Sequence, residues 1–187
     1  MKKLVALILG VALIGGVVAA QDGSKDAKTE AKKLDFTLKD LDGKAFTLAD
    51  IKDKYVVIEW TESACPAVRP HYSKKNSKNI QGIVKRFKDK GVVWLAVCST
   101  SKNTVEGLKK FRSEFDIKHP ILTDFNGKVG KLFGAKRTPH MFVLKNGEVL
   151  YQGAIDDRKS GNNYVVQALD ELMAGKAVST PRTRPYG

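Results

Sequence analysis

The pattern of apolar and polar positions changes most abruptly at residues 55–72. The segment Tyr55–Ile58 is apolar and β-branched, charged residues precede it, and Trp60 ends it. This pattern predicts a strand that is buried on both faces. A short polar turn then leads to Cys65 and Pro66, and proline is favoured in the first turn of a helix. We therefore expect Cys65 at or beside the N-cap of a helix, where a thiolate is favoured over a thiol.

Strands and helices alternate along the rest of the chain. The patterns predict, in order, a hairpin (34–38 and 45–48), a short helical turn (48–54), the strand 55–60, a helix from Cys65 to about Lys90 that Pro70 kinks, a strand (92–98), a helix (104–115), an extended piece (121–122), a small helix (129–133), a second hairpin (141–144 and 149–151) around Asn146-Gly147, and a terminal helix (164–173). This order indicates an α/β fold with parallel neighbouring strands. Reactive groups in such sheets gather at the carboxyl ends of the strands, where Cys65 and Cys98 should both lie.

The two ends of the chain lack these patterns. Residues 1–20 combine a charged start, an apolar run and small residues before Ala20, which predicts a signal peptide cleaved after Ala20. An uncleaved membrane anchor is the alternative, although the apolar run is short for a membrane span. Residues 21–33 resemble a polar linker and residues 177–187 an extended tail, which leaves a domain at 34–176. We expect an exported protein, periplasmic or secreted, that meets the membrane only through its leader.

Charge adds one constraint. The 187 residues include 33 Lys and Arg against 20 Asp and Glu, a net charge of +13. Such a balance permits weak attraction to anionic surfaces. The sequence has no nucleic-acid-binding motif and no basic run with interleaved aromatic residues, so we expect a lysine-rich protein surface and no nucleic-acid partner.

A second motif, Thr138-Pro139, precedes a predicted strand. A cysteine after the central strand and a Thr-Pro before a later strand resemble the marks of the thioredoxin-like fold. Within it, the segments Trp-x4-Cys-Pro-x-Val-Arg-x-His, VVWLA and TPHMFV resemble exported bacterial members of the redoxin group, the alkyl hydroperoxide reductase/thiol-specific antioxidant superfamily. The resemblance implies a three-layer sandwich, in which helices flank a central mixed sheet and a β-hairpin extends the N-terminal side. It also implies a cis peptide before Pro139 that packs against Cys65.

Two departures from these relatives concern the mechanism. Thioredoxins have a second cysteine where this chain has Val68, so disulfide cycling within a Cys-x-x-Cys pair is excluded. Peroxiredoxins have a hydroxyl residue where this chain has Glu62, and a proline where it has Ile58. Peroxide chemistry stays open, although its usual hydroxyl is missing.

Charged neighbours of Cys65 have opposite expected effects. Arg69, four residues on, and Arg137, beside the Thr-Pro step, would favour the thiolate. Glu62 would oppose the thiolate, or accept a proton if its own pKa were raised. For each of these residues a solvated surface charge is an equal alternative. The other expected supporting residues are Trp60, Pro66, Thr138 and Pro139.

A metal site is a weaker interpretation. His71 and His140 could join Cys65 as ligands, but the Cys-x3-Cys pattern of thioredoxin-like copper chaperones is missing. We therefore expect no metal and no cofactor, and we expect His119 only to fill a loop. Cys98 ends an apolar strand, so we expect a buried structural thiol that is not bonded to Cys65.

Three functions remain open. The leading one is an exported thiol oxidoreductase or antioxidant in which Cys65 is the single nucleophile. It would act on disulfides or hydroperoxides and be resolved by an external thiol or protein reductant. The second is a non-catalytic thioredoxin-like module whose Thr138-Pro139 edge binds peptides. The third is a copper- or haem-delivery accessory.

Overall fold

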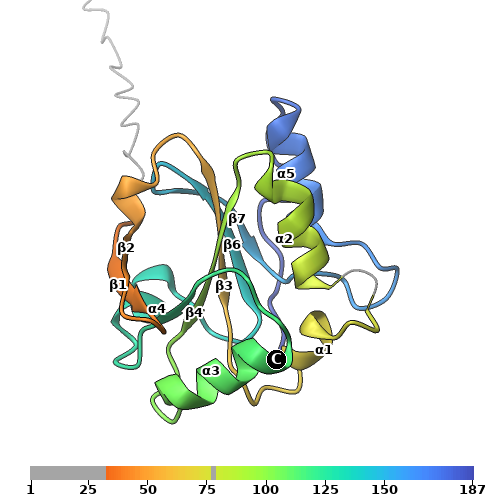
Figure 1. Cartoon of the computed structure of the whole chain (residues 1–187). Coiled ribbons are helices and arrows are strands. Elements are labelled where there is room, and N and C mark those ends of the chain that lie inside the picture. Colours follow the sequence, from red (N-terminus) through yellow and green to blue (C-terminus); the bar gives the residue numbers. More distant parts are fainter. Residues whose placement is uncertain (1–32, 77–78) are drawn as a thin grey trace, which may run out of the picture. The chain divides into compact units, whose positions relative to one another are not determined.

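The computed structural model describes residues 33–76 and 79–187, and one sheet of seven strands runs through this part of the chain (Figure 1). The strand order is β2-β1-β5-β4-β3-β6-β7. The elements are β1 (Thr37–Asp40), β2 (Ala45–Thr47), the 3-10 helix η1 (Leu48–Asp50), β3 (Tyr55–Trp60), α1 (Arg69–Tyr72), α2 (Ile80–Lys88), β4 (Val93–Cys98), α3 (Val105–Glu114), β5 (Ile121–Thr123), α4 (Lys128–Phe133), β6 (His140–Lys145), β7 (Glu148–Gly153) and α5 (Tyr164–Met173).

The central strand β3 explains how the two sequence motifs meet. It runs parallel to β4, with Trp60 opposite Val97, and antiparallel to β6, with Trp60 opposite His140. The carboxyl end of β3 therefore lies beside the start of β6. Residues shortly after Trp60 and shortly before His140 must then meet at one edge of the sheet. The β4–β5 pair is parallel and the β1–β2, β1–β5 and β6–β7 pairs are antiparallel, so the sheet is mixed, as expected.

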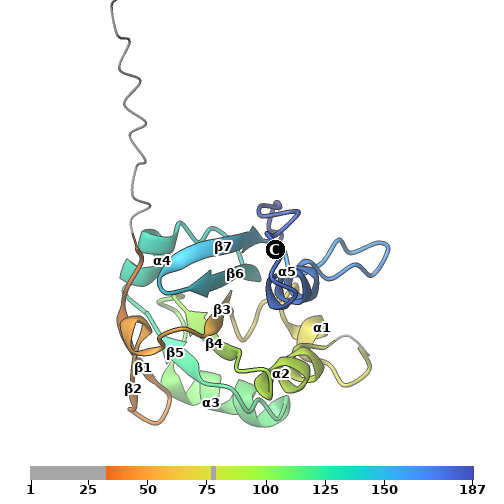
Figure 2. The same ribbon diagram turned by 90° about the horizontal axis from the view of Figure 1, so that it is seen from above.

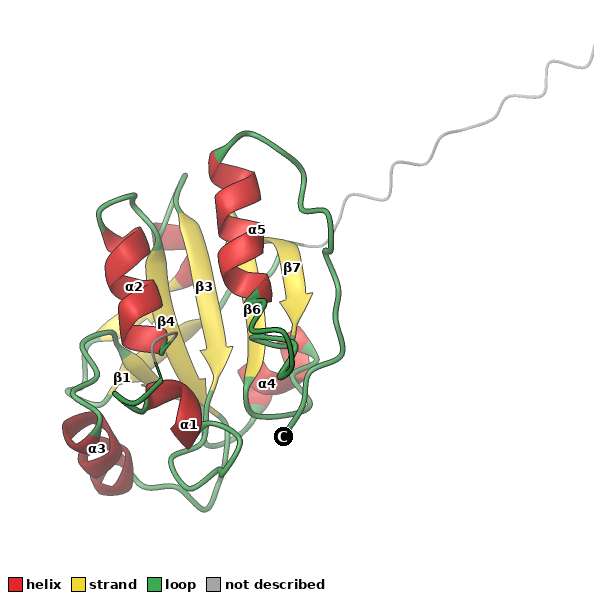
Figure 3. Cartoon of the chain, turned by 90° about the vertical axis from the view of Figure 1, so that its right-hand side faces the viewer, coloured by secondary structure: helices red, strands yellow, loops and turns green. Residues whose placement is uncertain are grey.

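Helices cover both faces of the sheet (Figure 2). The helices α1, α2, α3 and α5 pack on one face, and α2 and α5 lie side by side across β3 (Figure 3). The helix α4 packs on the other face. Side chains alternate between the faces along each strand, so Val57 joins the first core and Ile58 the second. Burying a side chain such as Phe87, which is 1% exposed, stabilises the fold by about 2 kcal/mol. The expected three-layer α/β architecture is confirmed.

The single long helix expected after Cys65 is wrong. The N–H of Val68 donates to the carbonyl of Cys65 at 3.0 Å and forms a turn, but the helix α1 begins only afterwards and has four residues. Pro70 lies in the first turn of α1 instead of kinking a longer helix. The chain is extended at Ser73, and α2 starts anew where the side chain of Asn79 accepts the N–H of Gly82 at 2.8 Å. Cys65 therefore precedes the helix rather than capping it.

Most other elements agree with the sequence pattern. The second hairpin turns at Asn146 and Gly147, whose φ angles of 50° and 79° suit a tight hairpin turn. The first hairpin begins at Thr37, three residues later than expected. The tail forms no helix or strand, but Arg182 makes an isolated bridge to Gln152 of β7.

The expected signal peptide (1–20) and nearly all of the expected linker (21–33) lie outside the described residues. Within the described ranges, no helix combines the length and the apolar character that crossing a membrane requires.

Candidate active site

Cys65 lies half-buried in the loop that follows β3. Its N–H donates to the carbonyl of Glu62 at 3.1 Å. Its thiol donates to the carbonyl oxygen of Thr138 at 3.3 Å. The Thr138–Pro139 peptide is cis, so the structure confirms both the expected isomer and the expected contact between the two motifs.

Trp60 lies five residues before Cys65, but its side chain packs on the other face of the sheet. It is 3% exposed and packs with the rings of Phe133 and Phe142, whereas Cys65 packs against the opposite core. Its indole N–H donates to the hydroxyl of Ser99 at 3.0 Å. Trp60 therefore ties β3 to the chain after β4 instead of touching the thiol.

Arg69 lies four residues after Cys65, and its guanidinium binds groups other than the thiol. Its guanidinium donates to the carbonyl of Ser63 at 3.1 Å and forms an ion pair with Glu114 of α3. It also lies over the ring of Phe115, 4.9 Å from the ring centre. Arg69 therefore fixes the loop before Cys65 to α3. Pro66 is exposed at the start of the following turn.

Hydrogen bonds from its own loop and from the segment after β4 favour the carboxylate form of Glu62. Its Oε1 accepts the N–H of Ala64 at 3.2 Å and the amide of Asn103 at 2.6 Å. Burial by itself raises the pKa of Glu62, but hydrogen bonds from Thr100, Asn103, Ala64 and Ser63 outweigh it and lower the pKa. The alternative in which Glu62 accepts a proton through a raised pKa is therefore wrong.

Cys98 is fully buried at the end of β4 and is not bonded to Cys65, as expected. Burial raises the pKa of its thiol. The amide of Asn103 donates to its sulfur at 3.2 Å. The same amide binds Glu62, so Asn103 links the loop before Cys65 to the end of β4.

Glu59 is a buried acid that sequence reasoning missed. Its Oε2 accepts the hydroxyl of Tyr72 at 2.8 Å and the indole N–H of Trp94 at 3.2 Å. Burial raises the pKa of Glu59 to about 7 in spite of these hydrogen bonds. The sequence did contain a signal for this site, since Glu59 is a lone carboxylate within the apolar run of β3. A carboxylate rarely lies inside a protein without hydrogen-bonding partners, so its position predicts a buried polar network.

His119 belongs to the same network and is not merely loop filling. It is 6% exposed, stacks on Tyr72, and its Nε2 lies 3.3 Å from the Tyr72 hydroxyl. Burial lowers the pKa of His119 to about 3. Glu59, Tyr72 and His119 therefore form a chain of polar groups beneath α1.

His71 and His140 have different hydrogen-bond partners from His119 and from each other. The Nε2 of His71 lies 3.0 Å from the hydroxyl of Tyr186, and the Nδ1 of His140 accepts the N–H of Lys136 at 3.3 Å. Burial and, to a smaller extent, the nearby positive charge of Lys136 lower the pKa of His140 to about 4. Within residues 33–76 and 79–187, no group of three or more His, Cys, Asp or Glu side chains could hold a metal ion.

The C-terminal tail reaches the site, which the sequence did not indicate. Thr183 packs against Gly153 of β7, and its hydroxyl accepts the N–H of Ala154 at 2.8 Å. The hydroxyl of Tyr186 donates to Asp156. Arg137 then donates to the carbonyl of Gly187 at 2.7 Å, so Arg137 binds the tail. Figures 1 and 3 mark the C-terminus at the edge of the sheet where β3 ends.

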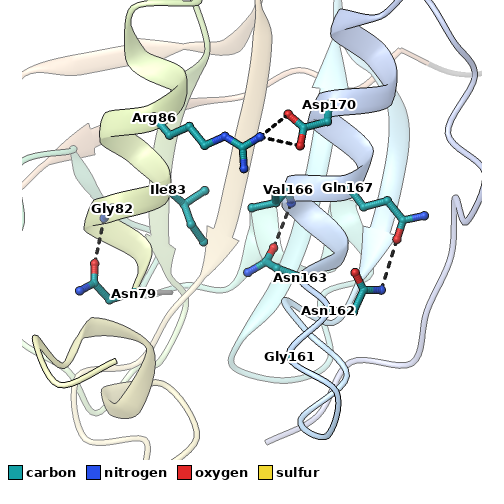
Figure 4. Close-up of a pocket in the computed structure, with 10 residues that line it drawn as sticks. All are labelled: Asn79, Gly82, Ile83, Arg86, Gly161, Asn162, Asn163, Val166, Gln167 and Asp170. Atoms are coloured by element: carbon teal, nitrogen blue, oxygen red, sulfur yellow. Dashed lines mark hydrogen bonds and ion pairs between the residues drawn. The ribbon is translucent and has the colours of Figure 1, made fainter. Parts of the chain in front are cut away.

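A groove of about 550 Å³ between α2 and α5 is separate from this site (Figure 4). Arg86 and Asp170 span it with two hydrogen bonds of 2.7 and 2.8 Å. Two of its amides are already used as helix caps, since Asn79 accepts the N–H of Gly82 and Asn163 accepts that of Val166. We interpret this groove as the place where α2 and α5 are joined by the Arg86–Asp170 pair, and not as a binding site.

The fold and the site define a thioredoxin-like protein built around one half-buried thiol and a cis-proline loop. The chain matches the AhpC/TSA family over residues 29–152, more than half of its length, and belongs to that family. The expectations of a redoxin-group protein and of a thiol-dependent oxidoreductase are confirmed at this level.

Named relatives agree with this class. The chain is 28% identical over 132 residues to thiol-disulfide oxidoreductase ResA of Bacillus cereus (strain ATCC 10987 / NRS 248). This match covers 69% of this chain and 72% of the relative. It is 28% identical over 169 residues to the protein of the same name from Oceanobacillus iheyensis, covering 86% and 84%.

Solved structures agree in fold. An uncharacterized conserved protein from Geobacillus kaustophilus has a TM-score of 0.69 at 24% identity, with 83% of this chain and 87% of that chain covered. The thioredoxin domain of a thiol-disulfide oxidoreductase from Bacteroides vulgatus has a TM-score of 0.55 at 22% identity, with 64% and 84% covered.

Proposed function

We propose that this protein is a thiol-disulfide oxidoreductase in which Cys65 is the single nucleophile. The observation that carries the proposal is the contact between the half-buried Cys65 thiol and the carbonyl of Thr138, beside the cis-proline. Val68, where a second cysteine would be expected, is fully buried. The mixed disulfide formed at Cys65 must therefore be resolved by an external thiol or protein reductant.

We propose supporting roles for the residues around Cys65. Glu62 and Arg69 hold the loop that carries Cys65, through Asn103 and Glu114 respectively. Thr138 orients the thiol, Pro139 shapes the loop opposite it, and Pro66 starts the turn after Cys65. Trp60 supports the site indirectly by binding Ser99. Arg137 does so by binding the C-terminal tail.

Adduct trapping tests this proposal. Incubation with a neutral peptide disulfide should leave one peptide half joined to Cys65, observed by intact mass and peptide mapping. Cys65→Ser should abolish the adduct and Cys98→Ser should keep it, because Cys98 is buried. Absence of the adduct in the wild type would contradict the proposal and favour a non-catalytic binding module.

Hydroperoxide reduction is the second candidate, which the AhpC/TSA match favours. Peroxide would oxidise the Cys65 thiolate to a sulfenic acid. Dimedone should then label Cys65 at a low peroxide concentration. If the yield of this adduct exceeds the yield of the mixed disulfide, hydroperoxide reduction is the better description of the activity. The names of the relatives favour disulfide exchange.

We also propose that the protein acts outside the cytoplasm after removal of residues 1–20. The charged, apolar and small-residue regions of the leader support this. The intact mass of the exported protein should correspond to a chain that starts near Gln21. A mass that retains Met1–Ala20 would contradict cleavage.

A further inference from the structure

One side of the route to Cys65 is occupied by the chain itself. The thiol contacts the carbonyl of Thr138, so a disulfide that reaches the sulfur lies next to the loop 137–139. Gly187 lies so close that a β-carbon on it would collide with that carbonyl oxygen and would lie 3.5 Å from the β-carbon of Ala67. The tail therefore covers the loop on the side of β7.

The other side of the same loop opens into a hollow of about 400 Å³. Its wall includes Thr138, the hydroxyl residues Ser99 and Thr100, and the side chains of Lys131, Lys136 and Arg137. We call it the basic hollow. Trp60 also lines it, and Cys65 does not. The basic hollow shares Thr138 with the Cys65 contact, so a group seated in it would be separated from the sulfur by the loop 137–139.

The charges around the basic hollow are unbalanced. Three cationic side chains line it and no lining residue carries a carboxylate. Arg137 already binds the carbonyl of Gly187, so the charges available to a bound anion are those of Lys131 and Lys136. Asp124, which binds Ser99, is 2% exposed and also accepts two N–H groups of α4, so it is already engaged. None of the ion pairs among the described residues includes Lys131 or Lys136, whereas Arg86 and Arg112 are paired with aspartates.

We propose that the basic hollow binds a carboxylate next to the scissile disulfide, so that the preferred substrates are disulfides with acidic groups beside the cysteine. This inference rests on the proposed function. The Cys65 thiolate attacks one sulfur, the substrate S–S bond breaks, and the other half leaves as a thiolate that takes a proton from water. The half whose carboxylate lies in the basic hollow stays joined to Cys65 until an external thiol exchanges with it.

Exposed charges act mainly on the rate of encounter, and salt screens them. We therefore expect an acidic disulfide to react about tenfold faster than its neutral counterpart at low ionic strength. The preference should shrink when salt is added, because the Debye length falls.

Two matched substrate pairs test this. The first pair is a short peptide disulfide with glutamates beside the cysteine, and the same peptide with glutamines. The second pair is dithiodipropionic acid and its diamide. A preference in both pairs shows that the carboxylate alone suffices, and a preference only in the peptide pair identifies an acidic peptide segment as the substrate. Either result supports the inference.

The location is tested with the double variant Lys131→Glu/Lys136→Glu. It should bring the acidic-to-neutral rate ratio down to about one or below. The control Lys52→Glu/Lys54→Glu makes the same charge change at exposed positions before the opposite end of β3 and should keep the wild-type ratio.

Equal rates for acidic and neutral substrates in the wild type would overturn the inference while the proposed function stands. A ratio that survives Lys131→Glu/Lys136→Glu, or that falls equally in the control, would also overturn it. If no disulfide of either kind modifies Cys65, the proposed function fails and the inference fails with it.

Discussion

The thiol of Cys65 donates a hydrogen bond to the main-chain oxygen of Thr138, 73 residues away in sequence, over 3.3 Å. The antiparallel β3–β6 pair makes this contact, because it sets Trp60 opposite His140 and so brings together the loops just outside the sheet. The Cys65 thiol is therefore positioned by strand register more than by any helix terminus.

The two cysteines should differ strongly in native reactivity. Cys65 is half-buried beside a surface loop, whereas Cys98 is 0% exposed and burial raises the pKa of its thiol. Iodoacetamide should modify Cys65 in the native protein and leave Cys98 intact until denaturant is added. Peptide mapping of alkylated protein measures this. Equal labelling of both thiols in the native state would contradict the buried position of Cys98.

Glu59 should make stability depend on pH. Burial raises its pKa from 4.5 to about 7, so the folded state holds this proton more tightly than the unfolded state. Stability is then lost as pH rises from about 4.5 to about 7, and the loss totals about 3 kcal/mol.

Glu59→Gln should remove this loss, so the variant should gain stability relative to the wild type as pH rises through the same window. Urea unfolding at several pH values measures the difference in the free energy of unfolding. The lowered pKa of His119 makes stability rise with pH, but His119 is present in both proteins and its effect is removed by the comparison. The matched control is Glu106→Gln at an exposed position of α3. A difference between Glu59→Gln and wild type that does not vary with pH would contradict the interpretation.

The tail should restrict access to Cys65. Thr183→Val keeps the side-chain shape but removes the hydroxyl that accepts the N–H of Ala154 and shares a hydrogen bond with Tyr151. We expect a loss of about 1–3 kcal/mol of stability and faster alkylation of Cys65, because Gly187 is released from the loop. Thr37→Val, at an exposed position of β1, is the control and should leave the alkylation rate unchanged.

Asp124 should be a strong structural anchor. Its carboxylate accepts the hydroxyl of Ser99 at 2.6 Å and the N–H groups of Val129 and Gly130 at 3.1 and 2.8 Å. Asp124→Asn replaces one acceptor by a donor and leaves a buried N–H unpaired, which should cost about 2–4 kcal/mol in the free energy of unfolding. The control Asp50→Asn, at an exposed position of η1, should cost much less. Similar costs for the two variants would contradict the role of Asp124.

The sequence by itself determined the order of elements and the two motifs of the site. The apolar run at Tyr55–Ile58, the helical stripes and the turn at Asn146-Gly147 are local patterns, and each follows from side-chain periodicity or backbone preference. The Cys-Pro and Thr-Pro motifs could be placed together because they resemble the marks of the thioredoxin-like fold, in which the two segments meet. Where local preferences conflicted, as at Pro70, the prediction of one kinked helix was wrong.

Only the tertiary structure decided which charged and polar groups became partners. Arg69 reaches Glu114 and Arg137 reaches Gly187, although spacing along the chain suggested that both would approach Cys65. Glu59 has a raised pKa because packing between β3 and α1 removes it from water. A long, flexible side chain can bind whatever lies within its reach, and that is set by how distant segments pack, which sequence spacing alone does not encode.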